Sequence, residues 1–99
     1  MAWKTVEEMT GPEVVNEAES LAYYAESCRE IEQGINSKES IRFRRCMERV
    51  EKEKLADPLT IVNLHTRWNP DLSRFHDMLH GLFKNGGTLD GMRKLFAPA

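Results

Sequence analysis

The strongest constraint on the fold is a stripe of small and apolar side chains between residues 13 and 34. Its members recur at alternating steps of four and three residues, and they are Val14, Ala18, Leu21, Ala25 and Cys28. This spacing places all of them on one side of an α-helix, where another element must cover them. Thr10 and Glu13 match a capping box at the start of this helix, and Gly34 is suited to the left-handed conformation that closes one. The pattern predicts one long helix.

A second long helix is predicted directly after it, over about residues 37–55. Asn36 is suited to cap its first turn, and Glu39 follows three residues later. The apolar residues of this segment share a narrower face and are Phe43, Cys46, Met47 and Val50. Because only Gly34–Asn36 separates the two helices, we expect them to pack as an antiparallel hairpin over residues 13–55.

The remainder of the chain predicts shorter helices. Asp57 and Pro58 mark the start of one. The β-branched residues that follow would also fit a strand, but a lone strand would have no partner in this chain. A further helix is expected from the apolar residues Leu72, Phe75, Leu79, Leu82 and Phe83, ending at Asn85-Gly86-Gly87.

The two ends of the chain are expected to fold back onto the hairpin. Thr5 begins a capping-box pattern typical of a short N-terminal helix, with Trp3 and Met9 packing on the core. A last turn from Thr88 is expected to bury Leu89, Met92, Leu95 and Phe96. We therefore predict an all-α fold, with residues 1–99 forming a single helical domain. It is built on the long antiparallel hairpin of residues 13–55, and two to three shorter helices in residues 57–96 pack on it.

A line of basic side chains is the first candidate functional feature. Its members follow steps of four, three, four and three residues in the second helix, and they are Lys38, Arg42, Arg45, Arg49 and Lys52. One interpretation is an ordinary solvated helix face, with Glu48 and Lys52 as an i,i+4 pair. The other is a docking strip for phosphates or for an acidic protein surface, which is favoured by the acidic residues lying off the line.

Charge is distributed unevenly along the chain. The net charge of −2 combines an acidic first third with a basic second helix. Glu19, Tyr23, Glu26 and Glu30 form an acidic outward face on the first helix. Because the first third of the chain is so acidic, the protein is not expected to be a general nucleic-acid binder. Because the second helix is basic, it is not expected to be a DNA mimic either, since a mimic would be acidic throughout.

The two cysteines indicate a reducing compartment. Cys28 and Cys46 each lie on the apolar side of a predicted helix, and neither a CxxC motif nor a signal peptide accompanies them. We expect reduced core thiols in a cytoplasmic protein, with a disulfide across the hairpin as the alternative. The apolar runs are too short for a membrane span.

The segment Arg67-Trp68-Asn69-Pro70 is the second candidate functional feature. Proline biases the residue before it away from the helical region, so a helix should break here. One interpretation is a cap, with Asn69 and Pro70 starting the next helix and Trp68 folded onto Phe75 or Leu72. The other is an exposed loop offered to a partner, since Trp and Arg are frequent interface anchors.

The sequence gives little support for catalysis or metal binding. His76 and His80 are one helical turn apart in a near match to HExxH, but Asp77 replaces the longer glutamate that activates water, and no third ligand follows. We expect these histidines at the edge of the apolar face. Some hydrolases expose their nucleophile on a sharp turn between a strand and a helix, and a helical chain has no such turn. We predict no enzyme activity, cofactor or metal.

The chain resembles the small accessory proteins of temperate phages, in particular the anti-RecBCD accessory proteins of lambdoid phages. The resemblance comes from the length, from the opening Met1-Ala2-Trp3-Lys4 and from Arg67-Trp68-Asn69-Pro70. It implies a protein that binds the host RecBCD exonuclease and modifies its activity in favour of phage recombination. A host prolyl isomerase reading the Asn69–Pro70 bond is implied as a further partner. No functional residue is carried over from the family.

These observations predict a non-enzymatic adaptor or inhibitor that docks on a larger host protein complex. The expected contact residues are the basic line and the loop, namely Lys38, Arg42, Arg45, Arg49, Lys52, Arg67, Trp68, Asn69 and Pro70. The first alternative is a helical DNA-binding regulator that uses the same cations on phosphates. The second alternative is a scaffold that assembles through acidic and basic faces of different copies.

Overall fold

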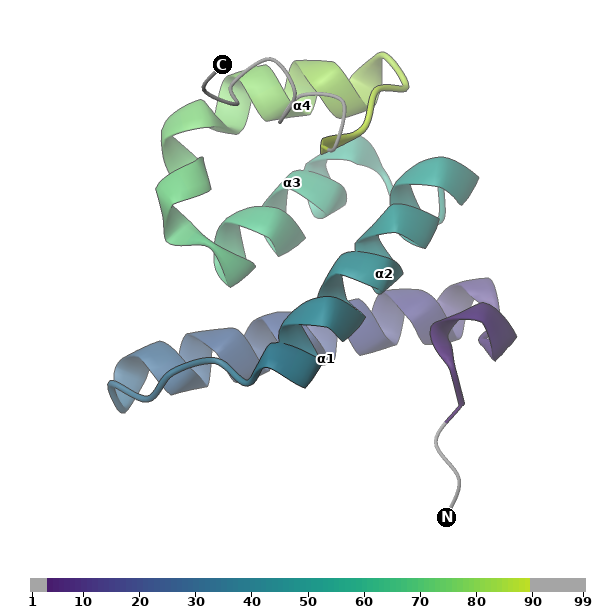
Figure 1. Ribbon diagram of the computed structural model, residues 1–99. Coiled ribbons are helices and arrows are strands. Elements are labelled where there is room, and N and C mark those ends of the chain that lie inside the picture. The colour runs from purple at the N-terminus through teal and green to yellow at the C-terminus, as the bar shows by residue number, and fades with distance from the viewer. Residues whose placement is uncertain (1–3, 90–99) are drawn as a thin grey trace, which may run out of the picture.

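The computed structural model describes residues 4–89, and every regular element in that range is helical (Figure 1). The prediction of an all-α fold is therefore confirmed. In chain order the elements are η1 (Val6–Glu8), α1 (Gly11–Glu30), α2 (Ser37–Glu53), α3 (Pro58–Trp68), η2 (Pro70–Phe75) and α4 (His76–Lys84). The elements η1 and η2 are 3-10 helices. Within the described range no helix combines the length and apolar character needed to cross a membrane.

The start of α1 is fixed by the predicted capping box. The Thr10 hydroxyl accepts from the Glu13 backbone N–H, and the Glu13 carboxylate accepts from the Thr10 N–H at 2.9 Å. These contacts lower the pKa of Glu13 to about 2. The hydrogen bond from the Thr10 backbone N–H is the largest cause, and the hydrogen bond from the Lys4 ammonium is the second. Electrostatics and backbone hydrogen bonding thus favour the same helix start.

The end of α1 differs from the prediction. Glu32, and not Gly34, adopts the left-handed conformation, with a φ of 54°. The Gln33 N–H then bonds to the Cys28 carbonyl at 2.8 Å, as in a Schellman-type termination. The assignment of Gly34 as the closing residue is wrong because the helix ends at Glu30, before the glycine is reached.

The starts of α2 and α3 are confirmed. Asn36 caps α2 by accepting from the Lys38 N–H at 2.8 Å, although no return bond from Glu39 completes a capping box. Asp57 caps α3 by accepting from the Thr60 N–H and hydroxyl, and the hydroxyl contact lowers the pKa of Asp57. The segment after Pro58 is therefore a helix and not a strand.

The predicted apolar faces of the two long helices are buried. The α1 stripe is fully covered, and Ala22 joins it. The α2 face is also covered, and its members Phe43, Cys46, Met47 and Val50 are each at most 3% exposed. Cys28 and Cys46 are free thiols, and burial raises the pKa of Cys46 to about 11. The disulfide alternative does not occur.

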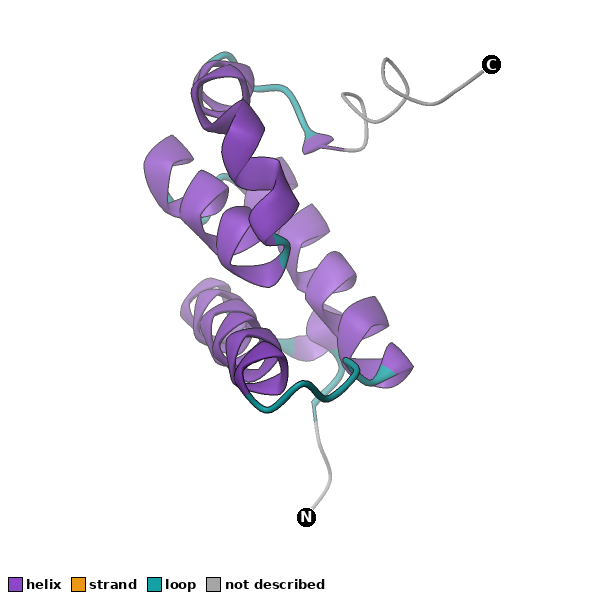
Figure 2. Ribbon diagram, turned by 90° about the vertical axis from the view of Figure 1, so that its left-hand side faces the viewer, coloured by secondary structure: helices purple, strands orange, loops and turns teal. Residues whose placement is uncertain are grey.

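The helices stack in layers above α1. Helix α2 packs on α1 and crosses it obliquely, while α3 packs beside α2 on the same helix (Figures 1 and 2). Elements η2 and α4 pack on α3 on the side away from α1 (Figure 1). The chain thereby leaves α2 and the α3–η2 junction facing each other.

The last predicted helix is interrupted. A 3-10 helix occupies residues 70–75, and only the following segment is α-helical. Leu79 and Phe83 are buried as expected, whereas Phe75 is 37% exposed. Met9 packs against the core and Leu89 is buried within it, as predicted. The expectations for Trp3, and for Met92 with Leu95 and Phe96, concern positions outside the described residues.

Candidate functional site

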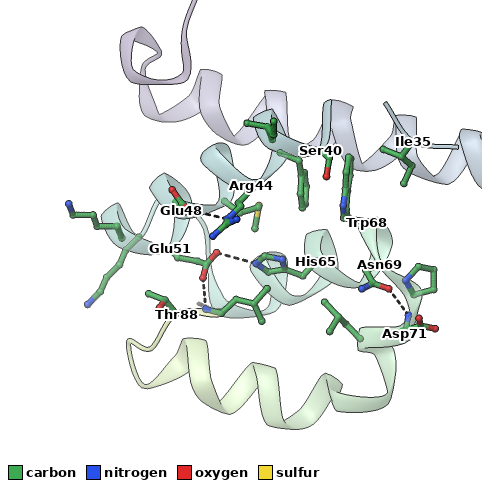
Figure 3. Close-up of a pocket in the computed structure, with 18 of the residues that line it drawn as sticks. Ile35, Ser40, Arg44, Glu48, Glu51, His65, Trp68, Asn69, Asp71 and Thr88 are labelled. Atoms are coloured by element: carbon green, nitrogen blue, oxygen red, sulfur yellow. Dashed lines mark hydrogen bonds and ion pairs between the residues drawn. The ribbon is translucent and has the colours of Figure 1, made fainter. Parts of the chain in front are cut away.

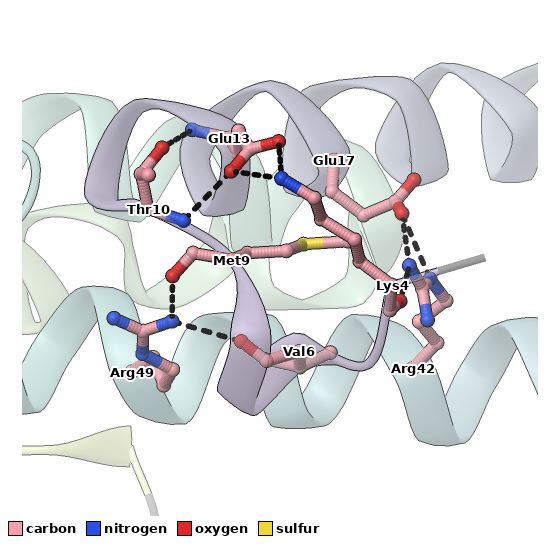
Figure 4. A network of polar contacts seen from close by, with 8 residues as sticks. All are labelled: Lys4, Val6, Met9, Thr10, Glu13, Glu17, Arg42 and Arg49. Carbon is pink, nitrogen blue, oxygen red and sulfur yellow. Dashed lines mark hydrogen bonds and ion pairs between the residues drawn. The ribbon is translucent and has the colours of Figure 1, made fainter. Parts of the chain in front are cut away.

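Arg42, a member of the predicted basic line, contacts the protein's own α1 helix. Its Nε and Nη2 atoms donate to one carboxylate oxygen of Glu17 at 2.8 and 2.5 Å. Nη2 also donates to the Lys4 carbonyl at 3.1 Å (Figure 4). The side chains of Arg42 and Glu17 are only 24% and 18% exposed. Arg42 therefore links α2 to α1 and to the N-terminal segment.

Arg49 has the same kind of internal role. Its Nη1 atom donates to the carbonyls of Val6 and Met9 at 2.8 and 2.7 Å (Figure 4). Its Nε and Nη2 atoms donate to the Glu53 carboxylate, which lowers the pKa of Glu53. The Val6 carbonyl also accepts from the Met9 N–H at 3.3 Å. By donating to two carbonyls of the N-terminal segment, Arg49 holds that segment against α2.

The basic line therefore divides into two groups. Arg42 and Arg49 are committed to the fold. Lys38, Arg45 and Lys52 are exposed, and their side chains make no ion pair with any residue from 4 to 89. Three cations of the predicted line, and not five, are therefore exposed without an ion pair among the described residues.

Asn69 and Pro70 of the Trp-Asn-Pro segment match the cap interpretation. Asn69 caps η2 by accepting from the Asp71 N–H at 3.2 Å, and Pro70 occupies its first turn, as the cap interpretation requires. Trp68 stacks on Phe43 of α2, with ring centroids 4.3 Å apart and planes inclined by 6°. The predicted partners were Phe75 or Leu72, and helical spacing gives no signal for Phe43 because it lies on another helix.

The end of α3 is held by an arginine that the sequence did not single out. Arg29 of α1 donates to the carbonyls of Arg67 and Trp68, the latter at 2.9 Å. A cation at the C-terminal end of a helix also interacts favourably with the helix dipole. Arg67 itself points elsewhere, with its Nε atom 3.6 Å from a carboxylate oxygen of Glu26. Arg29 thus positions the backbone that carries Trp68.

An open groove of about 1060 Å³ lies between α2 and the α3–η2 junction (Figure 3). Its apolar lining includes the Phe43–Trp68 stack, together with Met47 and Leu72. The charged and polar lining residues are Arg29, Ser40, Arg44, Glu48, Glu51, Lys52, Lys54, His65, Asn69, Asp71 and Thr88. Of the predicted contact residues, Lys52 and Trp68-Asn69-Pro70 line the groove, while Lys38, Arg45 and Arg67 do not. The two halves of the predicted docking surface are therefore largely separate.

A buried acid–imidazole pair lies at the base of this groove. His65 Nε2 is 3.1 Å from a carboxylate oxygen of Glu51, and the side chains are 7% and 5% exposed. The other Glu51 oxygen accepts from the Leu89 N–H at 2.8 Å (Figure 3). The imidazole stacks on Phe83 with ring centroids 5.6 Å apart and meets the edge of Phe43. The pair thus joins α2, α3 and the segment after α4.

The sequence contained only weak signals for this pair. Glu51 follows the buried Met47 by four residues, and His65 follows the buried Ile61 by four. Residues four apart lie on the same face of a helix, so Glu51 and His65 each lie on a buried face. A charged residue at such a position is ordinarily assigned to solvent. Glu51 and His65 are fourteen positions apart in the sequence, so no local motif links them.

The other histidines do not assemble a metal centre within residues 4–89. His76 Nε2 lies 3.5 Å from Asn63 Oδ1, and its Nδ1 lies 3.8 Å from Asp77. No group of three or more His, Cys, Asp or Glu side chains in this range has an arrangement that could hold a metal ion. Both His76 and His80 are half-buried at the edge of α4, as expected.

Comparison of the chain with models of protein families, with curated proteins and with solved structures finds no match. The groove has an open mouth, a charged rim, and a base that combines apolar and aromatic side chains with the Glu51–His65 pair. Such a surface is suited to contact with another molecule.

Proposed function

We propose that this chain is a non-enzymatic adaptor or inhibitor that docks on a larger host protein complex through the groove between α2 and the α3–η2 junction. The observation that carries the proposal is the open groove over the Phe43–Trp68 stack. Ile41, on the α2 rim, is 56% exposed and extends the apolar surface outward. The proposal treats α1 and α2 as one rigid hairpin that frames this surface.

The size and chemistry of the groove support a protein partner. Interfaces of this kind draw their affinity from a few apolar or aromatic anchors that are fully desolvated on binding. One Leu, Ile or Phe side chain buried in such a groove contributes about 1.5–3 kcal/mol. Several anchors are needed to exceed the entropic cost of association, and a groove of about 1060 Å³ has room for them.

The resemblance to anti-RecBCD accessory proteins makes the host RecBCD exonuclease the first partner to test. Under this proposal the chain modifies RecBCD activity in favour of phage recombination. Asn69 and Pro70 are exposed at the groove rim, so a host prolyl isomerase remains part of the proposal as a second partner.

The DNA-binding alternative is weakened by the commitment of Arg42 and Arg49 to internal contacts. Five phosphate contacts would give a log–log salt slope of roughly −4.5 on duplex DNA, whereas three would give roughly −2.7. Duplex retention with a slope of roughly −2.7, abolished by Arg45→Glu, would favour a DNA-binding regulator over an adaptor.

The proposal is tested with a matched pair of isoleucines. Ile41 and Ile31 are 56% and 67% exposed, but only Ile41 lines the groove. We expect Ile41→Glu to weaken binding of purified RecBCD, or of a partner captured from host lysate, by about thirtyfold, because a charge replaces an apolar contact. Ile31→Glu should leave binding unchanged. Equal losses in the two variants, or no loss in either, would overturn the groove as the docking site.

A further inference from the structure

One end of the groove carries lysines that make no close ion pair within the described residues. Lys52 and Lys54 line the groove at the C-terminal end of α2. An adjoining cavity of about 160 Å³ is lined by Lys54 and by Lys84 of α4. All three lysines are exposed, and their side chains make no ion pair with any residue from 4 to 89.

The acidic residues near these lysines are already engaged. Glu51 contacts His65 and the Leu89 N–H, and Glu53 contacts Arg49. Glu48, one turn back along α2, lies 3.4 Å from Arg44. The lysine end therefore presents positive charge to an incoming molecule.

The opposite end of the groove carries a carboxylate. Asp71 lies there, next to Asn69 and away from Thr88 (Figure 3). Its side chain is exposed and makes no ion pair with any residue from 4 to 89. Arg29 also lines the groove and keeps its positive charge, but its guanidinium is held by the carbonyls at the end of α3. Asp71 is therefore a carboxylate that an incoming positive group can meet.

The length of the groove fits a helical segment. The lining residues of α2 extend from Ser40 to Lys54, directly beyond the helix end. At 1.5 Å per residue this stretch measures about 20 Å, which is the length of about four helical turns. An amphipathic helix with its apolar face in a groove is a recurrent mode of recognition.

We infer that the docked segment is an amphipathic helix of about four turns with acidic residues in its last turn, lying with that end against Lys52, Lys54 and Lys84. The inference rests on the proposed docking function and adds the chemistry and direction of the partner. The negative end of the helix dipole and the acidic side chains meet the lysines, while the positive end meets Asp71. The partner helix consequently runs parallel to α2.

The test uses phage-displayed helices of 15 residues, with a fixed leucine-rich face and randomised remaining positions, panned on the full chain. The Ile41→Glu chain serves for counter-selection, so that only groove-dependent binders are kept. We expect these binders to be enriched in Asp and Glu in the last turn. Lys52→Glu combined with Lys54→Glu should weaken them by about tenfold, because attraction at two sites becomes repulsion.

Lys38→Glu is the matched control, since Lys38 is an exposed α2 lysine outside the groove, and it should change affinity by less than twofold. Groove-dependent binders that lack acids in the last turn, or carry them in the first, would overturn the inference and leave the docking function intact. The same holds if Lys38→Glu weakens binding as much as the double variant. Failure to recover any groove-dependent binder would count against both the inference and the docking function.

Discussion

Removing the Glu51 carboxylate should destabilise the protein far more than its place on a charged helix suggests. Glu51 is 5% exposed at its side chain and makes two contacts, with His65 at 3.1 Å and with the Leu89 N–H at 2.8 Å. Glu51→Ala leaves both of these buried groups without a partner. Each unsatisfied buried group costs about 1–3 kcal/mol.

We therefore expect Glu51→Ala to lower the free energy of unfolding by about 3 kcal/mol, equivalent to a fall in Tm of roughly 12–24 °C for a domain of this size. Glu51→Gln is the matched control. Its amide oxygen still accepts from the Leu89 N–H, and its N–H can donate to a neutral His65. The loss for Glu51→Gln should be less than about 1 kcal/mol.

Urea unfolding followed by circular dichroism at 222 nm measures both variants. A double-mutant cycle with His65→Phe should give a coupling energy above about 1 kcal/mol, because the two side chains are in contact. Hydrogen exchange at the Leu89 amide should accelerate in Glu51→Ala and stay slow in Glu51→Gln. Equal stabilities for Glu51→Ala and the parent chain would show that the pair does not hold the helices together.

Four further outcomes follow from the described contacts. Thr10→Ala should cost about 1 kcal/mol by removing the helix cap. Because the pKa of Glu13 is lowered to about 2, its stabilising contribution is complete above the unfolded value of 4.5 and is lost as pH falls from there toward 2, which a pH series of thermal melts would show. Arg49→Gln should release residues 4–9, and limited proteolysis should cut that segment faster than in Lys52→Gln. Cys46, with a pKa raised to about 11, should resist a thiol reagent at pH 8 until urea unfolds the chain, and rapid labelling of the native protein would contradict its burial.

Much of the fold was predictable because its signals are local. The α1 and α2 stripes depend on side-chain spacing, and the caps at Thr10, Asn36 and Asp57 depend on neighbours within three residues. The end of α1 was missed because Glu32 takes a conformation that glycine favours. Nothing in the residue types indicates that the chain would turn before Gly34.

The candidate site was less predictable because it depends on which helices meet. The basic line on α2 has the expected spacing, but the sequence does not show that η1 and α1 approach it and engage Arg42 and Arg49. The Trp68–Phe43 stack and the Glu51–His65 pair likewise join residues from different helices. Tertiary packing creates these contacts, and helical periodicity alone carries no information about them.

The position of the docked partner is the most direct test of the account. A photo-crosslinking residue, p-benzoylphenylalanine, is placed at Ile41 on the groove rim or at Ile31 outside it, and each full-length chain is irradiated in host cells. We predict that position 41 forms an adduct with one larger protein and that position 31 does not. Adducts from position 31 alone, or adducts from position 41 that contain only a second copy of this chain, would contradict a groove that docks on a larger protein.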